Sequence, residues 1–233
     1  MASTDHTLDL TDVRYQWPGR SAFGLDIANF TVSQSERVLL LGASGSGKST
    51  LLSLICGTIV ADRGSVSVGG KDIASLSSGQ RDRFRAEHIG LIFQQFNLLP
   101  FASVLDNVLL PLHFAPARRA RVTSPRQAAR DLCLTLGLPK DAIAAQAGTL
   151  SVGQQQRVAA ARALIGAPPL IVADEPTSAL DAATQAIFLD LLFEQVCASG
   201  GTLLMVSHDA RLSPQFDRAV QMSEITQSLQ DAR

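Results

Sequence analysis

The chain has 233 residues, of which 46% are hydrophobic and 18% are charged. Its 20 Lys and Arg residues nearly balance its 21 Asp and Glu residues, for a net charge of −1. A nucleic-acid-binding protein usually carries a basic excess, so we expect no nucleic-acid partner. A chain of this length and hydrophobic content can bury a sizeable core, as one large domain or as two unequal lobes.

The N-terminal residues carry no apolar core of the kind found in secretory signals. No apolar run approaches the roughly 18 residues of a membrane-spanning helix. Three cysteines, Cys56, Cys133 and Cys197, lie far apart within apolar helical patterns and predict free buried thiols in a reducing compartment. We therefore expect a cytosolic protein that reaches a membrane only through a partner.

Short apolar runs at residues 8–15, 23–30 and 38–41 predict three strands, and residues 65–68 predict a fourth. Polar and glycine-rich stretches separate these runs, which favours short connections between neighbouring strands. The N-terminal part of the chain therefore predicts an antiparallel β patch.

The third run leads into the sequence Gly-Ala-Ser-Gly-Ser-Gly-Lys-Ser-Thr, and a helical apolar face follows it. Glycines without Cβ allow backbone N–H groups to turn inward around phosphate oxygens at a helix N-terminus. A lysine adds charge for the β- and γ-phosphates, and the next serine offers a hydroxyl to Mg²⁺. The alternative is a Gly/Ser-rich turn with a chance lysine. The predicted nucleotide-binding residues are Gly42, Ser44, Gly45, Ser46, Gly47, Lys48, Ser49 and Thr50.

The charged residues 78–88 predict a solvated helix, and residues 89–93 predict a buried strand that stops at Gln94. From residue 97 to residue 165 the pattern is helical. It is interrupted by residues 116–126, which we interpret as a loop whose four arginines are solvated or contact lipid headgroups. These arginines are Arg118, Arg119, Arg121 and Arg126.

Ser151 and Gln154 form a capping-box pattern at the start of an alanine-rich helix that ends at Gly166. The buried run 170–173, a helix over 182–197 and the buried run 203–206 follow. Strands alternating with helices predict an α/β fold with a mostly parallel sheet.

Four polar residues follow predicted strands, where ligands of parallel sheets bind: Gln94, Asp174, Glu175 and His208. Asp174 is placed to hold the hydration shell of Mg²⁺, and Glu175 to orient and deprotonate an attacking water. His208 can donate to a γ-phosphate, and the amide of Gln94 can serve both a metal-bound water and that phosphate. The alternatives are a helix cap for the acidic pair, a structural histidine and a surface glutamine.

Taken together, these residues resemble the ATP-binding cassette family over nearly the whole chain. The matching motifs are Walker A (42–50), the Q-loop Gln94, the signature (150–154), Walker B (170–174), the catalytic carboxylate Glu175, the D-loop (178–181), the switch His208 and the adenine-stacking position Tyr15. The resemblance implies an ATPase that uses ATP and Mg²⁺, with Ser49, Gln94 and Asp174 at the metal.

The resemblance also implies a P-loop NTPase core with the antiparallel β patch and a helical signature-motif subdomain. Residues 1–233 would form a single ABC ATPase domain, with a core of residues 1–96 and 167–233 and a helical subdomain of residues 97–166. In this family two cassettes pair head to tail. Ser151, Gly153 and Gln154 would then contact the ATP bound by a partner cassette, most simply in a homodimer.

Val152 stands where the family signature has Gly. A β-branched residue takes a positive φ only with strain of roughly 1 to 2 kcal/mol. Either the turn does not need that conformation, or closure of the dimer is weakened. We expect a somewhat weaker ATP-bound dimer that still hydrolyses ATP.

Residues 89–100 and 154–157 are similar to the LolD/MacB-type branch, whose members drive lipoprotein release, macrolide export and other export through FtsX-like permeases. This similarity implies an ATPase subunit held on the cytoplasmic side of the cell membrane by an integral membrane permease. A permease helix would dock near the Q-loop, at Phe96, Leu98, Leu99, Phe101 and Val104. The alternative is an FtsE-like regulatory ATPase that transmits force through a membrane partner without transporting a solute. Soluble ABC proteins acting on DNA or ribosomes and P-loop kinases fit the motifs less well.

Overall fold

The structure, a computed structural model, describes residues 6–18 and 24–226. The chain divides into two compact units, Met1–Arg85 with Thr202–Arg233, and residues 86–201. The predicted helical subdomain, 97–166, falls entirely within the second unit, and its independence stays a prediction. Residues 1–5, 19–23 and 227–233 of the predicted domain lie outside the described residues, and they include Phe23 at the expected start of the second strand.

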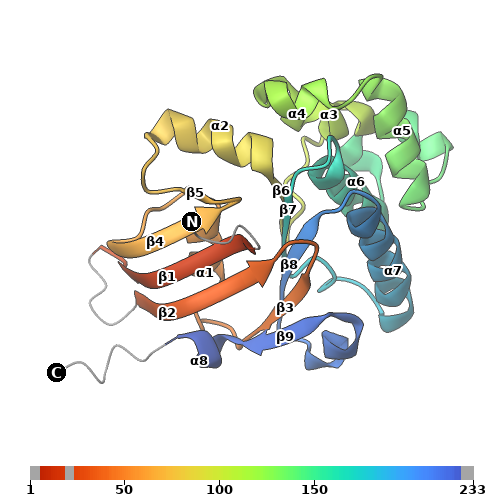
Figure 1. Cartoon of the computed structure of the whole chain (residues 1–233). Helices are drawn as coiled ribbons and strands as arrows, with labels where there is room; N and C mark the ends of the chain where they lie inside the picture. Colours follow the sequence, from red (N-terminus) through yellow and green to blue (C-terminus); the bar gives the residue numbers. More distant parts are fainter. Residues whose placement is uncertain (1–5, 19–23, 227–233) are drawn as a thin grey trace. The chain divides into compact units, whose positions relative to one another are not determined.

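In the first unit, an antiparallel sheet has the strand order β2-β1-β4-β5 (Figure 1). Its strands are β1 (His6–Gln16), β2 (Gly24–Ser33), β4 (Arg63–Val68) and β5 (Lys71–Asp72). Alternation along β1 buries Leu8, Leu10 and Val13 completely. The predicted antiparallel patch is therefore confirmed.

The same unit contains parallel strands, with β3 (Arg37–Leu41) paired on one side with β8 (Thr202–Ser207) and on the other with β9 (Arg218–Gln221). Every residue of β8 is buried. This explains its continuous apolar run, which is typical of a parallel strand covered on both faces. The short elements η3 (Ala210–Gln215) and α8 (Met222–Ile225) flank β9.

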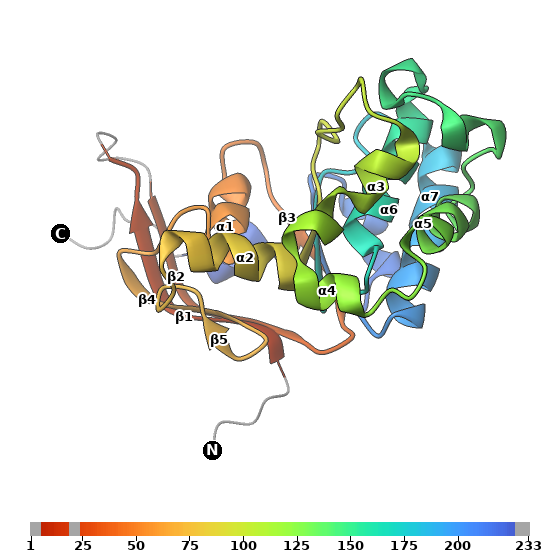
Figure 2. The same ribbon diagram turned by 90° about the horizontal axis from the view of Figure 1, so that it is seen from above.

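Helix α1 (Lys48–Ile55) follows β3, and α2 (Ser78–His88) contains the division between the two units, which falls after Arg85. Figure 2 shows α2 beside α1, where Arg81 Nε donates to the Gly57 carbonyl at 3.2 Å. Only Glu87 is buried on α2, so the predicted solvated helix is confirmed over most of its length.

In the second unit, β6 (Ile89–Ile92) and β7 (Leu170–Asp174) pair in parallel, with Ile92 opposite Ala173. Helices α3, α5 and α6 pack against one another (Figure 1). The helices of this unit are α3 (Val104–Phe114), α4 (Pro116–Ala120), α5 (Pro125–Thr135), α6 (Val152–Leu164) and α7 (Ala182–Ala198), with the 3₁₀ turns η1 (Asp141–Ala144) and η2 (Ala147–Thr149).

The prediction of a solvated arginine loop at 116–126 is wrong in two respects. Residues 116–120 form α4, and the side chain of Arg118 is only 1% exposed. Its guanidinium donates to the carbonyls of Ala163 and Ile165, both at 2.6 Å, at the end of α6. The last carbonyls of a helix have no intrahelical partner, so a buried cation can satisfy them.

The cysteine prediction is only partly correct. Cys56 and Cys133 are buried free thiols, whereas Cys197 is exposed. Burial raises the pKa of Cys133 to about 12, so this thiol stays protonated. Cys197 follows the buried Val196 on α7, and one step along a helix turns a side chain away from the buried face.

Over the described ranges, the structure contains no helix that is both long and apolar enough to span a membrane.

Candidate functional site

The loop between β3 and α1 has a backbone that only glycine adopts without strain. Gly45 has a φ of 80° and Gly47 has a φ of 97°. A Cβ on Gly47 would lie 2.6 Å from Cδ2 of Leu25, so the position also lacks room for a side chain. Gly47 is the N-cap of α1, and no side chain caps this helix. The first N–H groups of α1 therefore remain available for an anion.

Lys48 and Ser46 add polar groups to this loop. Lys48 is only 7% exposed, and its Nζ donates to the carbonyls of Gly42 at 2.7 Å and Ala43 at 2.9 Å. The Ser46 hydroxyl is buried and has no hydrogen-bond partner among the described residues. A buried cation beside an unused hydroxyl fits a polyphosphate, because phosphate oxygens accept hydrogen bonds from both. Ser44 and Ser49 are exposed, so their hydroxyls are accessible.

Tyr15 and Trp17 lie on one face of the N-terminal strand region, next to α1. Tyr15 is only 7% exposed, and its ring meets the Trp17 ring edge-on, with centroids 5.3 Å apart. Trp17 Nε1 donates to Oγ1 of Thr50 at 3.1 Å. Trp17, which is half-buried, is a residue that sequence reasoning missed. The sequence contains a signal for Trp17, because residues two apart on a strand share a face and Trp17 lies two positions after Tyr15. It is also the single tryptophan of the chain.

His208 follows β8 at the point where β8 runs beside the start of the phosphate-loop segment. Leu41 lies opposite Ser207 in the parallel pair, and the Gly42 N–H donates to the Ser207 carbonyl at 3.3 Å. His208 is exposed. Within the first unit, the structure therefore brings the histidine's segment to the beginning of the loop, as the sequence predicts.

In the second unit, the structure places Gln94, Asp174 and Glu175 at the same end of two neighbouring strands. Ile92 and Ala173 are paired, Asp174 is the last residue of β7, and Gln94 is exposed just after β6. The carboxyl ends of parallel strands are the usual ligand positions in such sheets. Gln94 and the acidic pair thus lie at strand ends, where the sequence analysis expects them, and their roles stay predictions.

Glu175 has a φ of 44°, which is unusual for a residue other than glycine. Such a conformation costs of order 1 to 3 kcal/mol and persists where neighbouring contacts enforce it. One such contact involves Pro176, the residue directly after Glu175. The fully buried Gln156 on α6 donates from its Nε2 to the carbonyl of Pro176 at 2.7 Å. The helix that begins at the signature sequence therefore holds the backbone next to this carboxylate.

Ser151 is the N-cap of α6 and forms the predicted capping box with Gln154. Val152 is the first helical residue and does not have a positive φ. Of the two readings of Val152, the structure therefore supports the one in which the turn does not need glycine. Val152 therefore carries no strain of this kind, and the expectation that such strain weakens the dimer is wrong. Ser151 is exposed, and Gly153 and Gln154 are half-buried.

The apolar residues predicted near the Q-loop divide into two groups. Phe96 and Val104 belong to the core, with 7% and 0% of their surface exposed. Phe101 is 74% exposed, Leu99 is 37% exposed and Leu98 is half-buried. A docking surface at this segment would therefore consist of Leu99 and Phe101 rather than all five residues.

The ABC transporter family profile matches residues 25–178. The chain is 42% identical over 193 residues to the uncharacterized ABC transporter ATP-binding protein YbbA of Escherichia coli (strain K12), which covers 82% of both chains. It is 40% identical over 200 residues to the lipoprotein-releasing system ATP-binding protein LolD of Syntrophotalea carbinolica, which covers 86% of both chains.

Among solved structures, the chain is similar to an ATP-binding cassette in a dimeric post-hydrolysis state bound to ADP and Pi. The identity is 32%, the TM-score is 0.78, and the alignment covers 92% of this chain and 93% of the other. The family match covers well over half of the chain and includes the phosphate loop and the acidic pair. The chain is therefore an ATP-hydrolysing cassette of the ABC transporter family.

Proposed function

We propose that this chain is the ATPase subunit of an ABC complex that energises an FtsX-like permease of the LolD/MacB type, for export or lipoprotein release. The similarity to LolD over 86% of both chains is the observation that carries this proposal. The exposed Leu99 and Phe101, a few positions after Gln94 in sequence, supply a surface for a permease helix. The protein would be peripheral, held by the permease on the cytoplasmic side of the membrane.

In the proposed reaction, the phosphate loop binds the β- and γ-phosphates through its N–H groups, Lys48 and the Ser46 hydroxyl. Tyr15 and its neighbour Trp17 flank the adenine. Glu175 orients the attacking water and takes its proton, while Gln94 and His208 contact the γ-phosphate.

We also propose a Mg²⁺ site made of Ser49, Gln94 and Asp174 together with ATP. In the part of the chain that the structure describes, no cluster of three or more His, Cys, Asp or Glu could hold a metal ion. A site with one carboxylate, a hydroxyl and substrate phosphates is the arrangement that Mg²⁺ commonly takes with nucleotides. When bound, the ion would neutralise phosphate charge.

The working unit in this proposal is a head-to-tail homodimer, because the chain carries one phosphate loop and one signature sequence. Ser151, Gly153 and Gln154 of one protomer would contact the γ-phosphate held by its partner. The exposed N-cap position of Ser151 supports this, since a helix N-terminus favours a negatively charged ligand. The related cassette of known structure is itself dimeric.

The test uses tagged Glu175→Gln, which removes the proposed base and should trap the ATP-bound dimer. We expect hydrolysis to fall by about 100-fold or more, because general-base catalysis contributes roughly 10²- to 10⁴-fold. Glu194→Gln, an exposed glutamate on α7, is the matched control and should hydrolyse ATP normally.

The trapped protein is then purified from detergent-solubilised membranes with Mg·ATP. Recovery of a permease with a large extracytoplasmic domain is the expected result. Stimulation of the complex by a solute or lipoprotein would favour transport over an FtsE-like regulatory role. A soluble dimer that binds ATP but recovers no membrane protein would overturn the proposal.

A further inference from the structure

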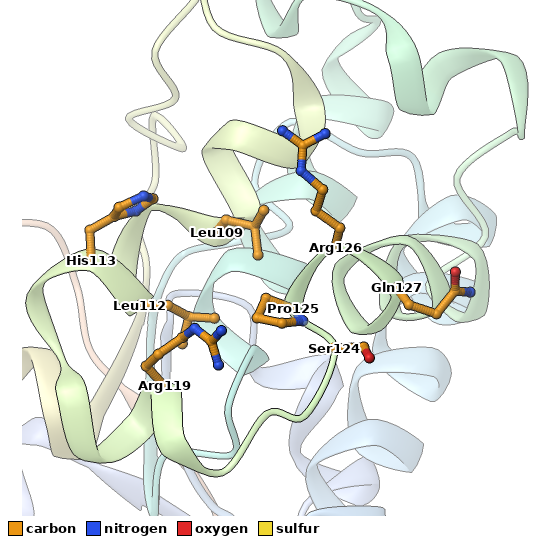
Figure 3. Close-up of a pocket in the computed structure, with 8 residues that line it drawn as sticks. All are labelled: Leu109, Leu112, His113, Arg119, Ser124, Pro125, Arg126 and Gln127. Carbon is orange, nitrogen blue, oxygen red and sulfur yellow. The ribbon is translucent and has the colours of Figure 1, made fainter.

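A cavity of about 660 Å³ lies in the second unit, between the end of α3 and the start of α5 (Figure 3). Leu109, Leu112 and Pro125 form the central part of its lining, and His113, Arg119 and Arg126 lie around them. The volume is in the range of pockets that take a small ligand or the anchoring side chains of a partner. None of these six residues belongs to the proposed nucleotide site.

The surroundings of this cavity carry an excess of cations. Residues 106–131 contain five arginines and two aspartates, although the whole chain has a net charge of −1. One of the aspartates, Asp131, accepts from Nε2 of the lining residue Gln127 at 2.7 Å. Two of these arginines serve the protein itself: Arg118 is buried against α6, and Arg121 donates to the carbonyl of Glu87. The other three arginines, Arg119, Arg126 and Arg130, are exposed.

Arg119 and Arg126 are the rim residues available to a ligand. Arg119 donates to the carbonyl of Val122 at 2.8 Å, which holds the guanidinium in place and leaves other donors unused. Within the described residues, neither Arg119 nor Arg126 forms an ion pair with an acidic side chain. A guanidinium that is already oriented loses less entropy on binding a carboxylate.

We propose that this cavity binds a short acidic amphipathic segment of the permease, with an apolar side chain on Leu109, Leu112 and Pro125 and carboxylates on Arg119 and Arg126. The inference rests on the proposed function, because it assumes a permease partner. An apolar anchor in a pocket with a charged rim is the usual form of an interface hot spot. Arginine pairs with carboxylate through two parallel hydrogen bonds, which fixes the orientation of the bound segment.

A lipid surface fits these observations less well. Anionic headgroups would be attracted by the arginines, but the aliphatic residues are recessed within a cavity and a flat bilayer does not fill a cavity. A protein segment can place one side chain into the recess and its carboxylates on the rim.

The first experiment reverses the rim charge with Arg119→Glu/Arg126→Glu in the Glu175→Gln background. Arg83→Glu/Lys140→Glu is the matched control, because it makes the same change of charge at exposed positions that do not line the cavity. We expect at least a tenfold loss of permease recovery for the rim variant and none for the control. ATPase activity without permease, measured with Glu175 intact, should be unchanged in both.

Equal recovery with the two variants would overturn the proposal. If the rim variant is poorly folded, Arg119→Gln/Arg126→Gln removes the same cations with less repulsion and should also reduce recovery.

The second experiment locates the contact with a photo-crosslinking residue at Gln127, which lines the cavity, or at Phe101. A crosslink from position 127 to an acidic segment of the same permease that position 101 reaches is the expected result. Replacing the acids of that segment with lysine should restore binding to the rim variant. A permease crosslink from 101 alone, or a lipid adduct alone at 127, would overturn the cavity proposal and leave the proposed function intact. No membrane protein at either position would overturn both.

Discussion

Arg118 is the most unusual residue of this fold, because a full guanidinium is almost completely buried. Five interactions hold it: its side chain reaches the carbonyls of Ala86, Arg162, Ala163 and Ile165, and its backbone N–H donates to Glu87. Burial is the largest effect and, together with the charge of Arg121, it lowers the pKa of Arg118 to about 10, although Glu87 opposes the shift. The side chain therefore remains charged at neutral pH and caps the C-terminus of α6.

We predict that Arg118→Met lowers the free energy of unfolding by about 3 kcal/mol or more. The substitution leaves several buried carbonyls without a donor, and each unsatisfied group costs about 1–3 kcal/mol. Urea denaturation measures this change. Arg130→Met, at an exposed position on α5, should stay within about 0.5 kcal/mol of the native chain. Similar effects of the two substitutions would show that the buried hydrogen bonds do not matter.

Gln156 acts on the reaction through the backbone next to Glu175. Its amide donates to Pro176, and its Oε1 has no partner among the described residues, so one hydrogen bond carries the connection. We predict that Gln156→Leu lowers kcat for ATP hydrolysis about tenfold with KM nearly unchanged. The reason is that the strained backbone of Glu175 loses a support while ATP-binding residues stay intact. A purely structural role would lower stability by about 1 kcal/mol and leave kcat per folded molecule unchanged.

At the scale of single elements, helix α6 begins with the N-cap residue Ser151, which in the proposed function also contacts the partner's γ-phosphate. The Ser151 hydroxyl accepts from the Gln154 N–H, and Gln154 Oε1 accepts from the Ser151 N–H at 3.0 Å. Loss of this cap and loss of a phosphate contact would both reduce activity, so a single alanine substitution cannot separate them.

We predict different outcomes for two substitutions of Ser151. Ser151→Ala removes the cap and should lower the free energy of unfolding by about 1 kcal/mol. Ser151→Asp keeps a cap of similar strength but places a negative charge where the partner's γ-phosphate would bind. It should therefore unfold like the native chain while ATP-dependent dimerisation, measured by light scattering in the Glu175→Gln background, weakens at least tenfold. Normal dimerisation of Ser151→Asp would contradict the proposed γ-phosphate contact.

Several elements and polar positions followed directly from the sequence, because they depend on local patterns, whereas α4 was predicted as a loop and the short elements β5, β9 and α8 were not predicted. Capping residues, apolar runs and glycines of positive φ fix where α6, β7 and the phosphate loop begin and end. The burial of Arg118 could not be predicted from the sequence, because an arginine is buried only if another element presents free carbonyls to it. The same limit applies to Phe96 and Phe101, which are both apolar loop residues. Only tertiary packing separates the buried Phe96 from the exposed Phe101.

At the scale of the whole molecule, the first unit joins distant parts of the chain by ion pairs at the edge of its parallel strands. Arg37, at the start of β3, holds Asp217 through its backbone N–H at 2.9 Å and its guanidinium at 2.6 Å. Arg218 on β9 donates to Glu36 at 2.7 Å. Each pair joins residues about 180 positions apart in sequence. The two pairs therefore link the two chain segments that make up the first unit.

These ion pairs make the free energy of unfolding depend on pH in the acid range. The hydrogen bond from Arg37 lowers the pKa of Asp217 below its ordinary value of 3.8. Burial alone would raise the pKa of Glu36, but hydrogen bonds from Arg218 and the Ser33 N–H outweigh it and lower the pKa below 4.5. A carboxylate with a lowered folded-state pKa stabilises the fold above its unfolded pKa. This contribution is lost as the pH falls through the folded-state pKa.

We therefore predict that Asp217→Asn is less stable than the native chain at pH 7, by up to about 1 kcal/mol because the pair is partly exposed. The difference should begin to shrink below about pH 4, where Asp217 becomes protonated in the unfolded state, and it should vanish once the pH has fallen through the lowered folded-state pKa. Urea denaturation at a series of pH values measures it. Asp190→Asn, an exposed aspartate on α7, should show no such pH-dependent difference. A gap between Asp217→Asn and the native chain that stays constant down to pH 2 would mean that packing, rather than charge, accounts for the contribution of Asp217.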